Sequence, residues 1–185
     1  IANRGEIALR ILRACRELNI STVAVYSKAD ELSLHTKFAD EAICIGPSES
    51  GKSYLNMAAI IAAAELTNAD AIHPGYGFLA ESSKFSGICS DNGIEFIGPN
   101  SQIIDLMGNK SEAKKTMKSI DIPVIYGSKG IINNTEEACE EAEKAGLPVI
   151  LKASAGGGGR GMRVVENLDQ MDNSFKTAQS ESELS

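Results

Sequence analysis

Hydrophobic and polar positions along the first hundred residues follow a regular rhythm of helices and short strands. Near the amino terminus, apolar residues recur at the spacing of one helix face, and this stripe consists of Ile7, Ile11, Cys15 and Leu18. Asn3 and Glu6 form a pair of the capping-box type at the start, and Asn19 is a plausible stop. The pattern therefore predicts a first helix between Asn3 and Asn19.

The same alternation continues through the rest of the first half of the chain. In order, the pattern predicts a strand at 21–27, a strand at 42–45, a helix at 54–67, a strand at 69–73, a helix at 82–91 and a strand at 95–97. Strands that alternate with helices and short loops indicate an α/β fold with a parallel sheet covered by helices on both faces. Ligands of such folds bind at the carboxyl ends of the strands, where residues 73–78 (HPGYGF) follow one predicted strand.

The rhythm changes after Pro99. The pattern there predicts helices at 101–107 and 110–119, an irregular stretch at 123–130, a helix at 135–145, a strand at 149–152, a glycine run at 156–159, a strand at 162–165 and a helix from 167. Two strands joined by a glycine loop predict a hairpin. We therefore expect three parts: an α/β domain at 1–98, a helical linker at 99–127 and part of a second domain at 128–185.

The composition argues against several classes of protein. The 185 residues carry 18 Lys and Arg against 25 Asp and Glu, and the net charge of −7 argues against a nucleic-acid binder. Apolar runs are too short for a membrane helix, and we expect no signal peptide. The four cysteines form no CxxC pair and lie among apolar residues, which favours reduced core positions and a cytoplasmic protein. Because the chain opens without Met inside an apparent motif, we expect a short lead-in before Ile1.

The segment from Lys152 to Met162 (KASAGGGGRGM) carries the strongest chemical indication. Glycines let backbone N–H groups converge on phosphate oxygens, and Lys152 on the preceding strand adds a positive charge. A flexible linker is the alternative, but linkers usually lie between domains rather than inside a hairpin. The segment therefore predicts a phosphate-binding loop.

A second glycine motif competes with the first. Residues 46–53 (GPSESGKS) match the P-loop pattern, follow a strand and precede a helix. Against this interpretation, Pro47 removes an N–H donor and Glu49 adds negative charge to an anion site. The P-loop is thus the weaker hypothesis.

Other polar residues have a structural interpretation beside a functional one. An isolated histidine at a strand end, such as His73, is more often structural than catalytic. Lys110 lies where a helix begins and could simply be solvated. Arg10, Arg13 and Glu17 form either a solvated helix face or a dimer contact. The spacing supports no Ser/His/Asp arrangement and no paired-carboxylate site.

Several stretches, taken together and in order, resemble biotin carboxylases, most closely the component of bacterial-type acetyl-CoA carboxylase. They are residues 1–15, 39–42, 53–55, 71–79, 96–99, 106–108 and 152–165. The resemblance implies an ATP-grasp ligase in which ATP activates bicarbonate as carboxyphosphate and biotin on a carrier protein is carboxylated. It implies a Rossmann-like domain at 1–98, a linker at 99–127 and part of the lid subdomain at 128–185. Residues 46–53 then have no nucleotide role.

The resemblance also implies roles for individual residues. Tyr76 and Gly77 would lie near biotin and bicarbonate, and the dimer contact would include Arg10, Arg13 and Glu17. The implied ATP-binding residues are Lys110, Lys152, Gly156, Gly157, Gly158, Gly159, Gly161 and Met162. The chain departs from the family pattern at Ala155, where a fifth glycine is common, and at Asn109, where Asp is common.

The resemblance implies further components of the reaction that these 185 residues do not supply. The resemblance implies magnesium or manganese ions, a biotin carboxyl carrier protein, carboxyltransferase subunits and a homodimer. It places the catalytic base and the metal-binding carboxylates beyond Ser185, so we expect these 185 residues alone to be inactive. Three alternatives stay open: the corresponding module of pyruvate, propionyl-CoA or methylcrotonyl-CoA carboxylase, a carbamoyl-phosphate synthetase-like ligase, and a non-catalytic nucleotide-binding module if the natural chain ends here.

Overall fold

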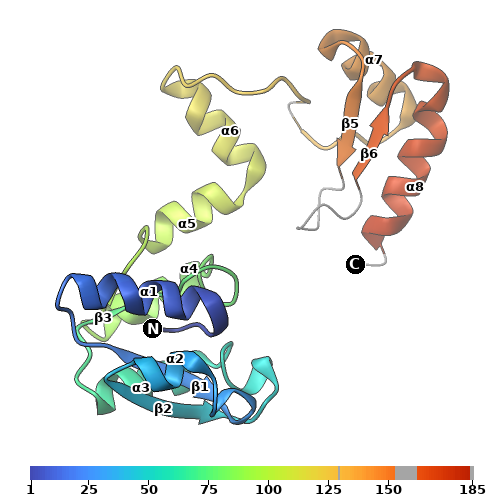
Figure 1. Cartoon of the computed structure of the whole chain (residues 1–185). Helices are drawn as coiled ribbons and strands as arrows, with labels where there is room; N and C mark the ends of the chain where they lie inside the picture. The colour runs from blue at the N-terminus through green and yellow to red at the C-terminus, as the bar shows by residue number, and fades with distance from the viewer. Residues whose placement is uncertain (129, 153–161, 184–185) are drawn as a thin grey trace. The chain divides into compact units, whose positions relative to one another are not determined.

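The protein forms two compact units in the computed structural model, residues 1–113 and 114–185 (Figure 1). The structure describes residues 1–128, 130–152 and 162–183, and for residues 110, 111 and 181–183 it describes the backbone alone. The domain limits expected after residues 98 and 127 stay a prediction.

The first unit alternates helices and strands, as the polarity pattern predicts. Its elements are α1 (Gly5–Glu17), β1 (Val23–Ser27), η1 (Lys28–Asp30), α2 (Leu34–Phe38), β2 (Glu41–Gly46), η2 (Ser50–Lys52), α3 (Met57–Leu66), β3 (Ala71–Ile72), α4 (Ser83–Asp91), β4 (Glu95–Phe96) and α5 (Ser101–Gly108). The helix expected from residue 54 begins at Met57, where the Asn56 side chain accepts a hydrogen bond from the N–H of Ala59. The predicted strand at 69–73 is reduced to two residues.

Two parallel strand pairs and the amino-terminal segment form the sheet of this unit. β1 pairs with β2 and β3 pairs with β4, both in parallel. The nitrogen of Ile1 donates to the Val23 carbonyl at 2.7 Å, and the N–H of Ala2 donates to the His73 carbonyl at 2.9 Å. Residues 1–3 therefore connect the two pairs, and the parallel α/β fold is confirmed. Asn3 lies beside the carboxyl end of β3, where its side chain bonds Pro74 and Tyr76.

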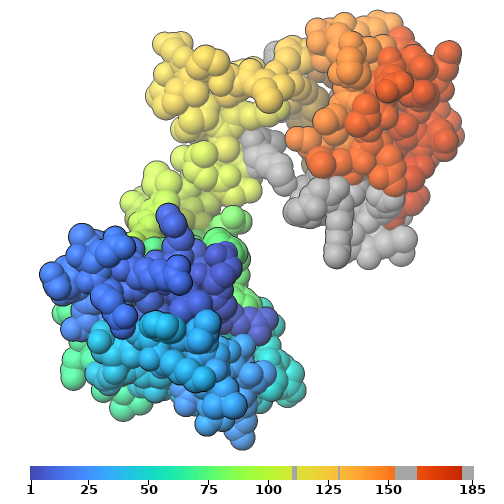
Figure 2. All heavy atoms as spheres, viewed as in Figure 1, coloured from blue at the N-terminus to red at the C-terminus, as the bar shows by residue number. Residues whose placement is uncertain are grey.

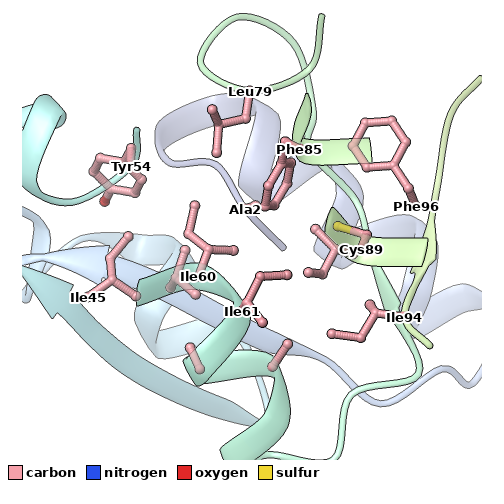
Figure 3. Close-up of a cluster of buried hydrophobic side chains, with 14 residues drawn as sticks. Ala2, Ile45, Tyr54, Ile60, Ile61, Leu79, Phe85, Cys89, Ile94 and Phe96 are labelled. Atoms are coloured by element: carbon pink, nitrogen blue, oxygen red, sulfur yellow. The ribbon is translucent and has the colours of Figure 1, made fainter. Parts of the chain in front are cut away.

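The core of the first unit is aliphatic with a few aromatic rings (Figure 3). Ile60 and Ile61 reach from α3 into the cluster that holds Phe85 and Cys89, all of them buried. Phe85 and Phe96 meet edge to face with their ring centres 6.0 Å apart, a geometry that the ring quadrupoles favour. This core fixes the strand ends on which a site can be built.

The first helix differs in detail from its prediction. Its buried face consists of Ala8, Ile11 and Leu12, while Leu18 lies past the helix end and is 70% exposed. The predicted capping box is wrong, because Arg4 is the N-cap residue and no side chain caps this helix. Asn3 and Glu6 instead make contacts with a distant loop, described below.

The predicted core position of the cysteines holds only in part. Cys89 is buried, and burial raises the pKa of its thiol to about 11. Cys15 and Cys139 are half-buried, whereas Cys44 is exposed because β2 presents that side chain outward. All four cysteines are free thiols. In the part of the chain that the structure describes, no helix has the length and apolar character needed to cross a bilayer.

The second unit is a hairpin covered by helices. Its elements, with the helix that leads into it, are α6 (Lys110–Ser119), α7 (Thr135–Ala145), β5 (Val149–Lys152), β6 (Met162–Val165), η3 (Leu168–Gln170) and α8 (Met171–Glu183). β5 and β6 are antiparallel, which confirms the predicted hairpin (Figure 1). Its buried core is small and consists of Ala138, Ala142, Val165 and Met171.

Candidate functional site

The loop of residues 73–78 follows β3 at the carboxyl edge of the sheet. Three of its residues have positive φ angles: +66° at Gly75, +65° at Gly77 and +38° at Phe78. A Cβ atom at Gly75 would lie 2.8 Å from the side-chain nitrogen of Asn3, so glycine is required there by both backbone angle and space. Tyr76 is 59% exposed and Gly77 is also exposed, so these two residues form the accessible tip of the loop.

Asn3 holds this loop from the other end of the sequence. Its buried side-chain amide donates to the carbonyls of Pro74 and Tyr76, each at 2.8 Å. Its oxygen accepts from the N–H of Arg4 at 2.9 Å. Both N–H donors of the Asn3 amide are thus used by the loop, and its oxygen accepts from Arg4 rather than from the first turn of the helix that follows.

The side chains of Tyr76 and His73 are also held. The Tyr76 hydroxyl donates a short hydrogen bond to the Glu6 carboxylate, and this bond raises the pKa of Tyr76. Nδ1 of His73 accepts from the N–H of Gly75 at 3.0 Å, and burial lowers the pKa of His73. A neutral imidazole is what that acceptor role needs, so the structural interpretation of His73 is supported.

Arg4 links the loop to the end of β1. Its guanidinium lies 5.4 Å from the Tyr54 ring centre and 5.6 Å from that of Phe78, and the two rings stack at 5.0 Å. These distances fall within the range of cation–π attraction. The Arg4 guanidinium also lies 3.4 Å from one oxygen of Asp30.

The Asp30 carboxylate, beside Arg4, also accepts hydrogen bonds. One carboxylate oxygen accepts from the hydroxyls of Tyr54 and Ser27, each at 2.8 Å. Burial would raise the pKa of Asp30, but these hydrogen bonds and the charge of Arg4 outweigh it and lower the pKa. Burial and the neighbouring carboxylate raise the pKa of Tyr54 to about 12.

Arg4, Asp30 and Tyr54 were not among the predicted site residues. Asp30 lies three residues beyond the end of β1, and Arg4 directly follows the segment that joins the strand pairs. A search for polar residues just after each strand, at the carboxyl edge of the sheet, would have found both. Tyr54 is separated from its partners in sequence and carried no such indication.

The hairpin of the second unit forms a second candidate region. Lys152 and Met162 are direct cross-strand partners where β5 ends and β6 begins, so the structure brings these two predicted site residues together. On the same face the side chains of Ile150, Val164 and Met162 are 54%, 59% and 42% exposed. The opposite face carries Val149 and Leu151 against the small core. The exposed face therefore combines three apolar side chains with one lysine.

The other predicted phosphate-binding residues are described only in part or not at all. Gly156, Gly157, Gly158, Gly159 and Gly161 lie outside the described residues. Lys110 begins α6, but its side chain lies outside the described part. It belongs to the first unit and Lys152 to the second.

Residues 46–53 do not form a phosphate cradle. The N–H groups of Lys52 and Ser53 donate to the carbonyls of Glu49 and Ser50 within the loop itself. The Lys52 ammonium lies 3.4 Å from the Glu49 carboxylate. Residues 50–52 form only a single 3-10 turn and no α-helix begins until Met57, so the P-loop hypothesis lacks the helix start that it needs.

The three predicted interface residues lie on one exposed helix face. Arg10, Arg13 and Glu17 are all exposed on α1, which forms an outer surface of the first unit (Figure 2). Their spacing of three and four residues puts them side by side along the helix. Among the described residues, no three His, Cys, Asp or Glu side chains gather as a metal site.

Comparison with known proteins identifies both halves of the chain. Residues 1–104 match the family described as "Biotin carboxylase, N-terminal domain". Residues 109–185 match "Carbamoyl-phosphate synthase L chain, ATP binding domain". The chain is 54% identical over 181 residues to biotin carboxylase 1 of Bacillus subtilis (strain 168), which covers 98% of this chain and 40% of that protein.

Solved structures agree with these matches. A biotin carboxylase–βγ-ATP complex from Campylobacter jejuni is similar with a TM-score of 0.88 and 52% identity over 99% of this chain and 41% of that one. A second similar structure is the biotin carboxylase domain dimer of Hydrogenobacter thermophilus 2-oxoglutarate carboxylase, in complex with MgADP, ADP and bicarbonate. Its TM-score is 0.84 and its sequence identity is 48%, over 98% of this chain and 40% of that one. The chain spans about 40% of the length of these relatives. Because the first family match spans more than half of its residues, this chain belongs to the family of biotin carboxylase N-terminal domains.

Proposed function

We propose that this chain is part of a biotin carboxylase, an ATP-dependent ligase that uses bicarbonate to carboxylate biotin on a carrier protein. The observation that carries the proposal is the exposed hairpin face in a member of this family. Ile150, Met162 and Val164 offer apolar contact to a flat base, and Lys152 offers a positive charge to phosphate oxygens. The relative from Campylobacter jejuni is a βγ-ATP complex, and the one from Hydrogenobacter thermophilus binds MgADP and bicarbonate.

Each region of the chain has a task in this proposal. Bound ATP, with its magnesium ions, supplies the phosphoryl group that activates bicarbonate. Lys152 and the glycine run bind phosphate oxygens, and the apolar hairpin face orients the base. Lys110 adds a second positive charge, and the tip formed by Tyr76 and Gly77 lies on the biotin and bicarbonate side. Preorganised charges of this kind stabilise the transition state of phosphoryl transfer.

The proposal is tested by phosphate release from ATP that depends on both biotin and bicarbonate, measured with the natural chain at its full length. Lys152→Ala should reduce kcat/KM for ATP by at least 100-fold. Lys52→Ala is the matched control and should change it less than twofold, because Lys52 pairs with Glu49 on an unrelated loop. Absence of biotin-dependent phosphate release from the unaltered protein would overturn the proposal, and the reverse ranking of the two variants would favour the P-loop. The 185 residues alone should release none.

The final carboxyl acceptor is a finer part of the proposal. We propose the first half-reaction of acetyl-CoA carboxylase in fatty-acid synthesis, in the cytoplasm, with a biotin carboxyl carrier protein and carboxyltransferase subunits as partners. The sequence resemblance supports acetyl-CoA, while the relative from Hydrogenobacter thermophilus is a 2-oxoglutarate carboxylase. Incorporation of labelled bicarbonate into acetyl-CoA, pyruvate or 2-oxoglutarate by the complex purified from its own cells distinguishes these acceptors.

The last part of the proposed function concerns dimer formation. We propose that Arg10, Arg13 and Glu17 contribute to a homodimer contact, since they present two positive charges and one negative charge on one exposed helix face. Arg13→Glu in the full-length natural chain should shift the protein from dimer to monomer in analytical ultracentrifugation. An unchanged dimer would contradict the role of this face.

A further inference from the structure

Three side chains at the start of α1 and just before it hold the loop of residues 73–78. Asn3 bonds two carbonyls of the loop, Arg4 packs against Phe78, and Glu6 accepts from the hydroxyl of Tyr76. These contacts join segments about 70 residues apart in sequence. We call residues 3–6 the brace. We propose that the brace is a positioning element that sets the pose of Tyr76 and Gly77 toward biotin, an inference that rests on the proposed function.

Asn3 supplies the larger share of this positioning. One side-chain nitrogen donates to the carbonyls of both Pro74 and Tyr76, so it fixes the backbone on both sides of Gly75. The close approach leaves no room for a Cβ atom at Gly75. An aspartate at this position would keep the bond from the N–H of Arg4. It would, however, place a carboxylate oxygen against two carbonyl oxygens, which repel it.

Glu6 acts on the exposed tip. Packing alone does not fix the Tyr76 ring, because more than half of that side chain is exposed. The Glu6 carboxylate accepts its hydroxyl proton, and a charged acceptor makes this bond stronger than a neutral one. The ring is therefore held by one hydrogen bond from a helix that is itself anchored in the core through Ala8 and Leu12.

Arg4 is the third side chain of the brace and contacts Phe78, the last residue of the loop. Its guanidinium lies against the rings of Tyr54 and Phe78, and Asp30 holds it at 3.4 Å. Phe78 has a positive φ angle, which is costly for an aromatic residue and persists only where surrounding contacts fix it. The loop is thus held at its two carbonyls, at its exposed ring and at its last residue.

A positioning role predicts a selective kinetic effect. In the full-length natural chain, with free biotin as the varied substrate, Asn3→Asp should raise KM for biotin tenfold or more. KM for ATP should stay within twofold, because the brace holds a loop of the first unit, whereas the hairpin belongs to the second. Asn92→Asp is the matched control: its side-chain nitrogen donates to the Ile88 carbonyl at 2.8 Å in the same unit, at the end of α4 rather than in the loop. That variant should leave both constants within twofold.

A second pair of variants keeps the test decisive where Asn3→Asp fails to fold. Glu6 is exposed, so Glu6→Ala should fold and should raise KM for biotin about fivefold. Glu6→Gln retains an acceptor oxygen and should recover part of that loss. As a readout apart from activity, the ultraviolet pH titration of Tyr76, isolated by subtracting the Tyr76→Phe protein, should move to lower pH in Glu6→Ala.

The possible outcomes separate the two proposals. A selective rise in KM for biotin in the brace variants supports positioning. Unchanged KM for biotin in Asn3→Asp and Glu6→Ala, or an equal rise in KM for ATP, overturns it while the proposed function stands. An unaltered protein that shows no biotin-dependent phosphate release overturns the proposed function itself. An unmoved Tyr76 titration in Glu6→Ala also counts against the brace.

Discussion

The loop at 73–78 and the exposed face of strands β5 and β6 are held by opposite means. The loop owes its shape to polar side chains from the far end of its unit, such as Asn3, which lies 71 residues from Pro74. The hairpin owes its shape to pairing between strands that are close in sequence and to the small cluster of buried side chains beneath them. The loop is therefore fixed by long-range hydrogen bonds and the hairpin by local pairing.

The largest expected effect concerns the two cores beneath these regions. Phe85 is fully buried in the first unit and packs edge to face on Phe96. Phe85→Ala should lower the free energy of unfolding of that unit by about 3–5 kcal/mol, because it removes buried apolar contacts and leaves a cavity. Urea denaturation of the 185-residue chain, followed by circular dichroism, measures the loss. A loss below about 1 kcal/mol would contradict the described packing.

The second unit should respond separately and somewhat less. Met171→Ala removes a fully buried side chain from the small core and should cost about 2–3 kcal/mol, since so small a core can relax around the change. Hydrogen exchange should show lost protection in β5, β6 and α8. Protection in β1 and α3 should stay unchanged. An equal loss of hydrogen-exchange protection in both units would contradict the division into two separately stabilised cores.

Local patterns predicted the second unit more closely than the first. Helix 135–145 and strands 149–152 and 162–165 were predicted with the observed limits, since periodicity and strand pairing decide them. The capping box of Asn3 and Glu6 was wrong because both side chains bond the distant loop instead. Local spacing cannot reveal such partners, which only the parallel sheet brings together.

The candidate site residues also divide into those that a local pattern predicts and those that it does not. Lys152 and Met162 could be placed together from a strand–glycine–strand pattern alone. The roles of Arg4, Asp30 and Tyr54 depend on three segments that meet at one edge of the sheet. Nothing in their local sequence shows which strands are neighbours, so pattern analysis could not assign them.

A smaller effect tests the close approach at the loop. Gly75→Ala should cost about 2 kcal/mol, because the new Cβ atom meets the Asn3 nitrogen and φ is +66°. Gly93→Ala is the matched control, with φ of +70° and no atom near its Cβ position, and should cost only about 1 kcal/mol. Thermal unfolding measures both variants. Equal costs would mean that the Asn3 contact adds nothing.

The smallest expected effect is a dependence on pH. The pKa of Asp30 is lowered in the folded protein from its ordinary value of 3.8. Its ionised form therefore adds stability above that value, and the gain is lost as pH falls through the lower folded pKa. Asp30→Asn should flatten the acid limb of the stability curve measured by urea titration below pH 5. The control Asp172→Asn removes an exposed partner of Lys176 and should flatten it less. A larger effect from Asp172→Asn would contradict the importance of the Asp30 cluster.

The most direct test of the contrast between loop and hairpin is a pair of KM values, for ATP and for biotin, measured on the full-length natural chain. Met162→Ser alters the exposed hairpin face and should raise KM for ATP about fivefold while KM for biotin stays within twofold. Asn3→Asp alters the brace and should give the opposite pattern. Two variants that raise the same constant, or that raise both constants together, would contradict the assignment of nucleotide to the hairpin and biotin to the loop.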